Sequence, residues 1–595
     1  MTEGSVAEQT AAPVVSESPS VIKRWEEDYS ETKVDEIEYD YIIVGSGSAG
    51  SALASRLSED ETKQVLLIEA GGVDTKDEIH MPAACANCQR CEIDWQYKTV
   101  PQKNSHFACK NQVGNWPRGK VLGGCSSINY MQFVRGDPND YNNWNLPEWT
   151  FDVMIKYFKK LEIADKNTIP LNSKYRSHDE KNGMVNASSL DAANELNKLF
   201  IESSIKNGFH QTDDYNAEDS LNGCVAHSQV STQGGKRWST ASAYLLSAVK
   251  RKNFHLLVSA YTTKVTFDEK KNATGVIIRR EKSLDTDETI RGKEVILSAG
   301  TIGSPQLLLL SGIGPRKELE KFQIPVIVDL PGVGKNLQDH LIVPIFYSST
   351  IQTLSLADLN QENLINWATN GKGVLTSCVV ESQSWCQVNQ NEENNVPDIQ
   401  THFCPFTVPK DVIENFNYKD EVLEKCFING NQWTAICIPT ILHPKSRGEI
   451  VLASANPLDY PLIDPNYLEN DEDVRTLIKA CQLFDKICQT EPLKNVLQSL
   501  AEDLNEEVKK SENEEKFWET YIRKYGITVY HPVGTCRMGL ENDPMTVVTQ
   551  DTKVKGVQGL RVVDASIIPK LISGNTNIPT IALGERAADL IKSNF

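Results

Sequence analysis

Long apolar segments and an excess of basic residues are both missing from this sequence, and each absence excludes a class of protein. The longest apolar candidate, Leu307–Leu310, has four residues, whereas a membrane-spanning helix needs about 20, so we expect no membrane span. The 61 Lys and Arg against 80 Asp and Glu give a net charge of −19. This balance argues against a nucleic-acid partner and favours solubility. No feature of the sequence predicts an oligomeric state.

A cysteine-based metal site and a secretion signal are also missing. Cys85, Cys88 and Cys91 form the only close group among 14 cysteines, and no fourth ligand follows at metal-site spacing, so we predict no metal site. Residues 1–38 are rich in Glu, Ser and Thr and contain no apolar core of a signal peptide. We expect residues 1–38 to be a disordered or loosely held arm and the protein, as written, to be cytoplasmic. Secretion is the alternative if a signal has been removed or replaced.

What the sequence does contain is an apolar strand that runs into a glycine-rich turn. Residues 39–44 are the strand, and Gly45, Gly47 and Gly50 follow in the spacing G-x-G-x-x-G, before a helical pattern over residues 51–57. A second strand over residues 65–68 ends at Glu69, about 20 positions after the last glycine, where the dinucleotide fingerprint places its acidic residue. The pattern predicts a βαβ unit that binds a nucleotide.

Each part of this unit has a physical role. The glycines form the tight turn and let the backbone approach a pyrophosphate, and the N-terminus of the helix offers free N–H groups and a positive dipole end. The carboxylate of Glu69 can accept hydrogen bonds from an adenosine ribose. We therefore predict that Gly45, Gly47, Ser48 and Gly50 contact the pyrophosphate.

Strands of the same type recur in the middle and at the end of the chain. They are predicted over residues 255–259, 264–267, 275–278, 293–300 and 560–566, and a closing helix is predicted over residues 577–591. A helix is also expected from Ser304, with serine as the N-cap and Pro305 at the first position. At 595 residues the chain is too long for one core, so we infer a nucleotide domain that a second domain interrupts.

Five further segments are long, specific and in a characteristic order. Together with the glycine-rich unit, they resemble the glucose–methanol–choline (GMC) oxidoreductases over about residues 39–591. The motif sequences are most similar to the animal glucose-dehydrogenase-like branch. The segments are Trp116–Asn129, Gly300–Gly314, Pro331–His340, Tyr530–Met538 and Ser573–Thr580.

The resemblance implies a fold class and a division of the chain. The expected fold is α/β (α+β overall), with a Rossmann-like FAD-binding domain interrupted by a substrate-binding domain that has an antiparallel sheet and helices. We expect the FAD-binding domain to comprise residues 39–150, 225–340 and 545–595. The substrate-binding domain is expected over residues 151–224 and 341–544.

The resemblance also implies the reaction. A primary or secondary alcohol would be oxidised to the carbonyl by hydride transfer to flavin N5, and the electrons would pass to O₂ or a quinone-type acceptor. Removing a hydride requires that the hydroxyl proton also leave, and histidine is the side chain best suited to accept it near neutral pH. His531 matches the position of the family's base. Asn575 matches a position that holds histidine or asparagine, and its amide can donate to the developing alkoxide.

The remaining predicted residues would hold FAD. Besides the glycine-rich turn and Glu69, the resemblance points to Val265 near the adenine, Asp564 and Ala565 near the flavin-side linkage, Arg118 and Asn129 beside the isoalloxazine ring, and Asn577 and Ile578 at its pyrimidine edge. Some relatives carry a histidine that bonds covalently to the flavin; here that position is Ile128. We therefore predict non-covalent FAD.

Two alternatives keep the fold and change the chemistry. A flavin-containing hydroxynitrile lyase would retain the flavin and the histidine without net redox turnover, and a non-catalytic FAD-binding scaffold would need neither catalytic segment. Net oxidation of an alcohol would distinguish an alcohol oxidoreductase from both alternatives. The substrate alcohol itself has no signature, because the segment that would surround it carries no recognisable motif.

Overall fold

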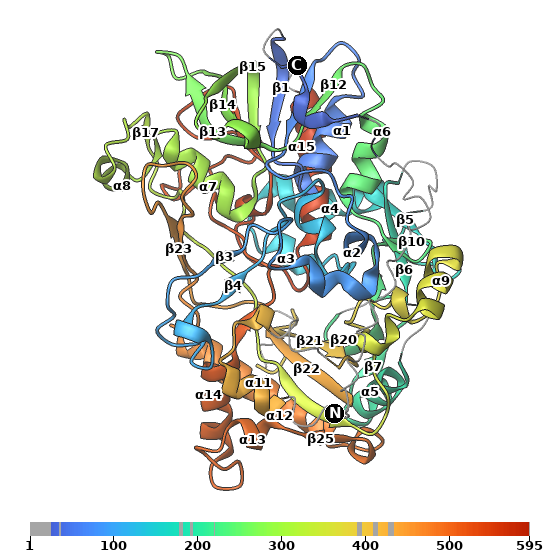
Figure 1. The fold of residues 1–595 in the computed structure, drawn as a ribbon. Coiled ribbons are helices and arrows are strands. Elements are labelled where there is room, and N and C mark those ends of the chain that lie inside the picture. The colour runs from blue at the N-terminus through green and yellow to red at the C-terminus, as the bar shows by residue number, and fades with distance from the viewer. Residues whose placement is uncertain are drawn as a thin grey trace, which may run out of the picture.

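The structure is a computed structural model of the full chain. It describes residues 25, 27–34, 37–177, 183–190, 194–218, 221–389, 396–407, 414–426 and 433–593. Two large sheets dominate the described part, and segments from the start, middle and end of the chain meet in the first of them (Figure 1).

The first sheet is mostly parallel and confirms the predicted nucleotide-binding architecture. Its order is β12-β2-β1-β15-β14-β13, and β27 pairs with the C-terminal half of β15. The β1, β2, β12, β15 and β27 strands are parallel, whereas β13 and β14 form an antiparallel extension. Their bounds are β1 Tyr39–Val44, β2 Val65–Ile68, β12 Phe254–Leu257, β13 Ala260–Phe267, β14 Ala273–Arg280, β15 Glu288–Leu297 and β27 Leu560–Val562.

Three helices begin at the carboxyl ends of these strands or close to them. Helix α1 (Ser48–Leu57) follows β1, helix α7 (Gly300–Leu310) follows β15, and helix α15 (Asn577–Ser593) packs along α1. The carboxyl ends of parallel strands and the starts of their helices form one edge of the sheet, which is where open α/β folds bind ligands.

Helix α7 begins five residues earlier than the sequence predicted. Ser304 and Pro305 lie inside it, and the N-cap is Ala299, which offers no side-chain oxygen. The N–H of Gly300 instead donates to Asp564 Oδ2 (2.9 Å), at the end of β27. The local capping rule failed because the acceptor comes from a segment 264 residues away.

The second sheet is largely antiparallel and lies below the first in Figure 1, in yellow and orange. Its order is β25-β19-β22-β21-β20-β8-β7, and β18 pairs with both β22 and β26. Helix α12 packs against β22, and helices α5 and α14 pack against α12. The bounds are β7 His210–Gln211, β8 Cys224–His227, β18 Leu341–Ile342, β19 Ile345–Ser349, β20 Ser382–Cys386, β21 Ile399–Cys404, β22 Trp433–Ile441, β25 Leu497–Ser499, β26 Ile527–Thr528, α5 Glu195–Lys206, α12 Asp471–Cys488 and α14 Glu514–Tyr525.

The remaining helices and strands are mostly short elements outside the two large sheets. Helix α4 (Phe151–Leu161) packs against α15, and β5, β6 and β9 form a three-stranded sheet. The other bounds are α2 Asp77–His80, α3 Pro138–Asn142, α6 Leu246–Ala248, α8 Arg316–Lys321, α9 Gln361–Asn370, α11 Asp420–Cys426, α13 Ala501–Leu504, β3 Tyr97–Lys98, β4 Asn115–Trp116, β5 Glu162–Ala164, β6 Val185–Ser189, β9 Gln229–Val230, β10 Thr232–Gln233, β11 Lys236–Arg237, β16 Ile313–Gly314, β17 Val328–Asp329, β23 Glu449–Val451 and β24 Leu462–Asp464.

The described part of the N-terminal arm is packed rather than loosely held. Trp25 is buried and its Nε1 donates to Asp74 Oδ1 (2.7 Å). Thr32 Oγ1 donates to the carbonyl of Leu256 (2.6 Å), and Val34 is buried. An indole and a valine provide apolar surface that the polar composition of residues 1–38 concealed. The rest of the predicted arm lies outside the described residues.

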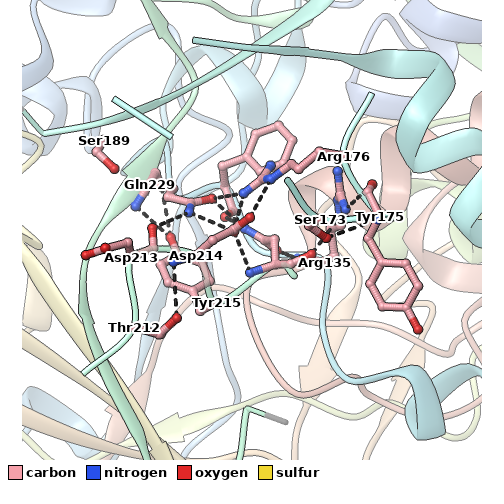
Figure 2. Close-up of polar contacts among 12 residues, drawn as sticks. Arg135, Ser173, Tyr175, Arg176, Ser189, Thr212, Asp213, Asp214, Tyr215 and Gln229 are labelled. Carbon is pink, nitrogen blue, oxygen red and sulfur yellow. Dashed lines mark hydrogen bonds and ion pairs between the residues drawn. The ribbon is translucent and has the colours of Figure 1, made fainter. Parts of the chain in front are cut away.

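Four charged side chains, those of Arg135, Glu162, Arg176 and Asp214, form a buried network. Figure 2 shows three of them, Arg135, Arg176 and Asp214, converging with the amide of Gln229. Arg176 Nη1 donates to Glu162 Oε2 (2.6 Å) and its Nε to Asp214 Oδ2 (2.8 Å), while Arg135 binds the same Glu162 carboxylate. Two guanidinium groups and two carboxylates therefore compensate each other out of contact with water.

Every strand of the first sheet lies in residues predicted for the FAD-binding domain. In the second sheet, β8 falls across the predicted boundary at residue 225, so the exact division remains a prediction. Within the described residues, no helix has the length and apolar character needed to cross a bilayer, and no group of His, Cys, Asp and Glu is arranged to hold a metal ion.

Candidate active site

A cavity of about 540 Å³ lies between the two sheets. One wall is the edge of the first sheet, where Val44 at the end of β1 and residues just after β2, β15 and β27 line the cavity, namely Glu69, Ser298 and Asp564. The opposite wall comes from β21 and β22 of the second sheet and carries His402, Cys404, Ile436 and Ile438. The catalytic candidates of the sequence, His531 and Asn575, line the same space.

The glycine-rich turn forms a cradle at the sheet edge. Gly45 has a φ of +102°, which favours glycine, and a Cβ on Gly50 would meet the carbonyl oxygen of Gly45 at 1.9 Å. Gly50 is therefore required for packing of the helix against the strand and does not itself line the cavity. At Gly47 a Cβ would meet nothing within 4 Å, so this backbone faces open space.

Three helix N-termini point to this cradle. Helices α1, α7 and α15 begin at residues that line the cavity, and Ser48 Oγ at the start of α1 donates to Asn577 Oδ1 at the start of α15 (2.6 Å). The aligned peptide dipoles at the starts of α1 and α15 favour an anionic group such as a pyrophosphate, whereas the start of α7 already binds the Asp564 carboxylate. This arrangement fits the phosphates of FAD.

The two acids at the strand ends are already hydrogen-bonded. Glu69 accepts from Ser46 N (3.0 Å) and Gly71 N (2.9 Å), and burial raises its pKa while these bonds oppose the rise. Asp564 accepts from Gly300 N and from Ser304, and burial likewise raises its pKa. Each carboxylate fixes a strand end, and Glu69 Oε1 retains a lone pair for a ribose hydroxyl.

The Trp116–Asn129 motif closes over the cradle. Arg118 Nη2 donates to the carbonyl of Tyr530 (2.6 Å), so this guanidinium joins the motif to the residue before His531. Asn129 Oδ1 accepts from Met131 N (2.9 Å) and Arg237 Nη1 (2.8 Å). Arg118, Ile128 and Asn129 all line the cavity, as does Ala565 next to Asp564.

Two predicted cofactor residues lie elsewhere. Val265 is fully buried in the core with Val276 and Leu308, and its N–H donates to Ser311 Oγ (2.9 Å). The residues of β13 that line the cavity are its first three, Ala260, Tyr261 and Thr262. Ile578 is also fully buried in the core, one residue inside α15, while Asn577 lines the cavity.

The backbone of His531 is held from several sides. Its N–H donates to Asp339 Oδ1 (2.8 Å), and burial raises the pKa of this aspartate to about 6. The preceding Tyr530 has a φ of +71°, a strained conformation that the bonds to Arg118 and Thr528 maintain. Helix α7 holds the next residue, because Thr301 Oγ1 donates to the carbonyl of Pro532 (2.7 Å).

The imidazole of His531 lies between a histidine and an amide. Its Nδ1 is 3.0 Å from Nδ1 of His340, and its Nε2 is 3.2 Å from Nδ2 of Asn575. Burial, followed by the neighbouring His340, His402 and Arg118, lowers the pKa of His531 well below 6.5. The ring is therefore neutral at pH 7 and can accept a proton.

Asn575 is oriented by the second sheet. Gln400 Nε2 on β21 donates to Asn575 Oδ1 (3.1 Å) and also to Gln383 Oε1 (2.6 Å). Because Oδ1 is occupied by a donor, the NH₂ group of Asn575 faces His531. The preceding Ser573 is fixed in turn, since its N–H and Oγ both donate to the buried carboxylate of Asp140 (2.6 and 2.9 Å).

Sequence reasoning missed several residues that complete this arrangement. Asp339 and His340 end the Pro331–His340 motif, which the sequence analysis used only for the resemblance. Gln400 and His402 are polar residues two apart on β21 and therefore share a face, a signal that could have drawn attention to that strand. Their partners are far away in the sequence, so only the fold brings them together.

The cavity wall opposite the first sheet, which β21 and β22 provide, is mainly apolar. Besides His531 and Asn575, the polar side chains that line the cavity away from the strand ends include Gln89, Gln132 and His402. The three acids that line the cavity lie elsewhere: Glu69 and Asp564 end strands of the first sheet, and Asp459 is bonded through its carbonyl to Gln306 of α7. The apolar lining residues away from the strand ends include Ala86, Ile342, Val379, Val380, Cys404, Phe406, Phe416, Ile436, Ile438 and Val529.

Comparison with known proteins gives one consistent family. A family model described as GMC oxidoreductase matches residues 39–342, and a second with the same description matches residues 444–584. The chain is similar to the alcohol dehydrogenase (acceptor) of Pseudomonas putida, with 38% identity over 567 residues that cover 93% of this chain and 95% of that protein. It is also 34% identical to the glucose dehydrogenase (FAD, quinone) of Drosophila pseudoobscura pseudoobscura, over 93% of this chain and 87% of that protein.

A solved structure shares the fold. The crystal structure of pyridoxine 4-oxidase from Mesorbium loti has a TM-score of 0.79 and 27% sequence identity to this chain, and the match covers 93% of this chain and 99% of that one.

Proposed function

This chain belongs to the GMC oxidoreductase family, whose members are FAD-dependent enzymes acting on CH–OH groups, and from that premise we propose that it oxidises a neutral alcohol with a largely apolar body to the carbonyl. The observation that carries the proposal is the contact between His531 and Asn575 inside the cavity at the strand ends. Either O₂ or a quinone-type acceptor would then receive the electrons.

We assign the proton transfer to His531. Its neutral imidazole can accept the hydroxyl proton while the carbinol hydride leaves, because charge then does not accumulate on the carbinol carbon. The NH₂ group of Asn575, fixed by Gln400, can donate to the same oxygen as it becomes an alkoxide. The two groups therefore act on one substrate atom.

FAD, when bound, supplies the hydride acceptor. The backbone at Gly45 and Gly47 and the start of α1 would hold its pyrophosphate, Glu69 its ribose, and the segments with Arg118, Asn129, Ala565 and Asn577 its flavin end. Ile128 has no nucleophilic atom, which supports non-covalent attachment.

The lining of the cavity supports a neutral substrate. Aliphatic side chains form much of the wall opposite the first sheet, and none of the three acids that line the cavity belongs to β21 or β22. A quaternary ammonium such as that of choline would find no carboxylate there, although aromatic rings could contact it. A hydrocarbon body would instead gain about 25 cal/mol for each Å² that it buries.

The test is anaerobic flavin reduction by two alcohols of the same shape. Purified FAD-loaded protein is mixed with choline or with its carbon isostere, in which a tert-butyl group replaces the trimethylammonium group, and the flavin absorbance is followed. We expect the second-order rate constant for flavin reduction to be at least about tenfold higher for the neutral isostere than for choline, because burying an unpaired charge is costly. Admission of air then distinguishes an oxidase, which recolours rapidly, from a dehydrogenase.

Faster reduction by choline would refute the proposed substrate class. Failure of every neutral alcohol in a wider panel to bleach protein that holds FAD would refute the proposed oxidation itself.

A further inference from the structure

A second histidine is buried directly against the proposed base. His340 is fully buried, and its ring lies nearly perpendicular to that of His531, at an interplanar angle of 83°. The β18–β26 pairing creates this contact, because Leu341 pairs with Thr528 and places the residue before β18 beside the loop after β26. The N–H of Val529 donates to the carbonyl of His340 (3.1 Å), which extends the pairing by one residue.

The positions of the ring protons follow from the partners. The Nε2 of His340 is 3.0 Å from the carbonyl oxygen of Leu442. A carbonyl can only accept, so this nitrogen carries the proton. Burial lowers the pKa of His340 to about 3, so the ring is neutral and its Nδ1 is an acceptor.

The same reasoning passes to His531. Its Nδ1 faces an acceptor at 3.0 Å and must therefore carry the proton of that ring. In a neutral imidazole the other nitrogen then has the lone pair, and Nε2 of His531 is the atom that faces Asn575 and the cavity. A donor chain thus runs from His531 Nδ1–H to His340 and from His340 Nε2–H to Leu442.

We propose that His340 is a positioning residue that holds the proton of His531 on Nδ1 and so keeps Nε2 available as the base. The inference rests on the proposed function only for its catalytic meaning, since the proton positions follow from the geometry. Without an acceptor at His340, nothing on that side would oppose the tautomer with the proton on Nε2. That tautomer cannot take a proton from an alcohol at the atom that faces the cavity.

The NH₂ group of Asn575 favours the same tautomer from the cavity side, because it donates to Nε2 of His531. Apart from His340, no charged or titratable neighbour in the described part of the chain fixes the tautomer. His340, His402 and Arg118 face its ring, and Asp339 binds its backbone N–H rather than the imidazole. His402 and His443 face His340. Of these groups, His340 alone forms a hydrogen bond with a ring nitrogen of His531 within the described residues.

The first experiment measures proton positions without turnover. The protein with bound FAD, labelled with ¹⁵N at its ten histidines, is examined by NMR between about pH 6.5 and 8, where the histidine tautomers are neutral. The His531 signals are identified by their loss in His531→Gln. We expect Nδ1 of His531 to be protonated and Nε2 to show the shift of an unprotonated nitrogen; a proton on Nε2 in the wild type refutes the proposal.

The second experiment uses two substitutions of similar size that differ in one property. In His340→Asn the Oδ1 atom can still accept from His531 Nδ1–H, whereas in His340→Leu no acceptor remains. We expect His340→Leu to shift the His531 proton toward Nε2 and to slow flavin reduction by an alcohol about 100-fold, because a wrongly held histidine tautomer is a poor base. His340→Asn should keep the wild-type tautomer and most of the rate.

Equal losses in both variants, or no change in either tautomer or rate, would contradict the role assigned to His340. Retention of FAD by both variants would show that the cofactor site is intact. If His340→Leu does not fold, the tautomer of the wild-type protein and the behaviour of His340→Asn still test the role assigned to His340. A wild-type protein with the expected tautomer that oxidises no alcohol would refute the proposed function and leave this inference standing.

Discussion

At the scale of single residues, the site is built to keep a histidine neutral. His531 is almost completely buried and is surrounded by two imidazoles and the Arg118 guanidinium, so a positive charge on it is disfavoured by desolvation and by repulsion. Within the described residues, no carboxylate is hydrogen-bonded to the ring of His531. In this respect it differs from the histidine of a Ser-His-Asp triad. The proton it accepts is therefore held only weakly.

This environment predicts an unusual acid limit for activity. The folded-state pKa is lowered, so His531 remains neutral as the pH falls through 6.5 and is protonated only at lower pH. We expect kcat/KM for a neutral alcohol to be constant from about pH 8 to 6.5 and to fall only below that range. In His531→Gln the rate should drop by about 10² to 10⁴ and this acid limb should disappear.

A matched variant, His255→Gln, changes a histidine on β12 outside the cavity and should keep both the rate and the limb. A limb centred at or above pH 6.5 in the wild type would show that the positive surroundings do not control the proton affinity of His531.

The structure brings some of the predicted site residues into the cavity and leaves others outside it, for definable reasons. Gly45, Glu69, His531 and Asn575 were placed in the cavity because each stands in a motif with fixed spacing. Val265 was misplaced because choosing the cavity-facing residue of β13 requires the register, which a β-bulge between Thr262 and Lys264 shifts. His340, by contrast, acquires its role from a contact 191 residues away, which no spacing encodes.

At the scale of elements, helix α7 joins the sheet edge to the segment that carries His531. Pro305 lies in its second turn and has no N–H to donate to the carbonyl of Thr301. Thr535 Oγ1, four residues after His531, donates to that carbonyl instead (2.6 Å). The carbonyl that Pro305 leaves without a helical donor therefore anchors the segment that carries His531.

A double-mutant cycle tests this attachment. Thr535→Val keeps the shape and removes the hydroxyl, so the buried carbonyl of Thr301 loses its partner, and we expect a loss of about 1–3 kcal/mol in stability. Pro305→Ala restores a helical N–H to the same carbonyl, so Thr535→Val should cost much less in that background. Thermal unfolding of the four proteins measures the coupling, and strictly additive effects would show that the two positions do not share the carbonyl.

At the scale of the whole molecule, distant segments meet in two sheets, and a buried charge network joins four further segments of the chain. The network of Arg135, Glu162, Arg176 and Asp214 lies behind Val134, which packs in one cluster with Trp385. Trp385 Nε1 donates to the carbonyl of Ser573, two residues before Asn575. The sequence predicted the two-domain plan from strand types and resemblance, but it did not predict this network, since isolated charges give no sign of burial.

Removing one charge from the network should be more harmful than removing an ion pair. Arg176→Met leaves two buried carboxylates with one guanidinium, and we expect a loss of about 3–5 kcal/mol, seen as a lower midpoint of thermal unfolding. Adding Asp214→Asn returns the network to neutrality and should recover part of that loss. A double variant as unstable as the sum of the single variants would show that charge balance is not what the network provides.

The discontinuous first sheet also constrains the order of events during synthesis. Its first strand begins at Tyr39, but β27 begins at Leu560 and α15 at Asn577, after every strand of the second sheet has been made. Domains generally fold as units as they leave the ribosome, yet here the cradle at Gly45 lacks Asp564 and Asn577 until almost 600 residues have been joined. The nascent chain therefore has to hold an unfinished nucleotide domain while a later domain matures, and cofactor capture belongs to the last stage of biogenesis.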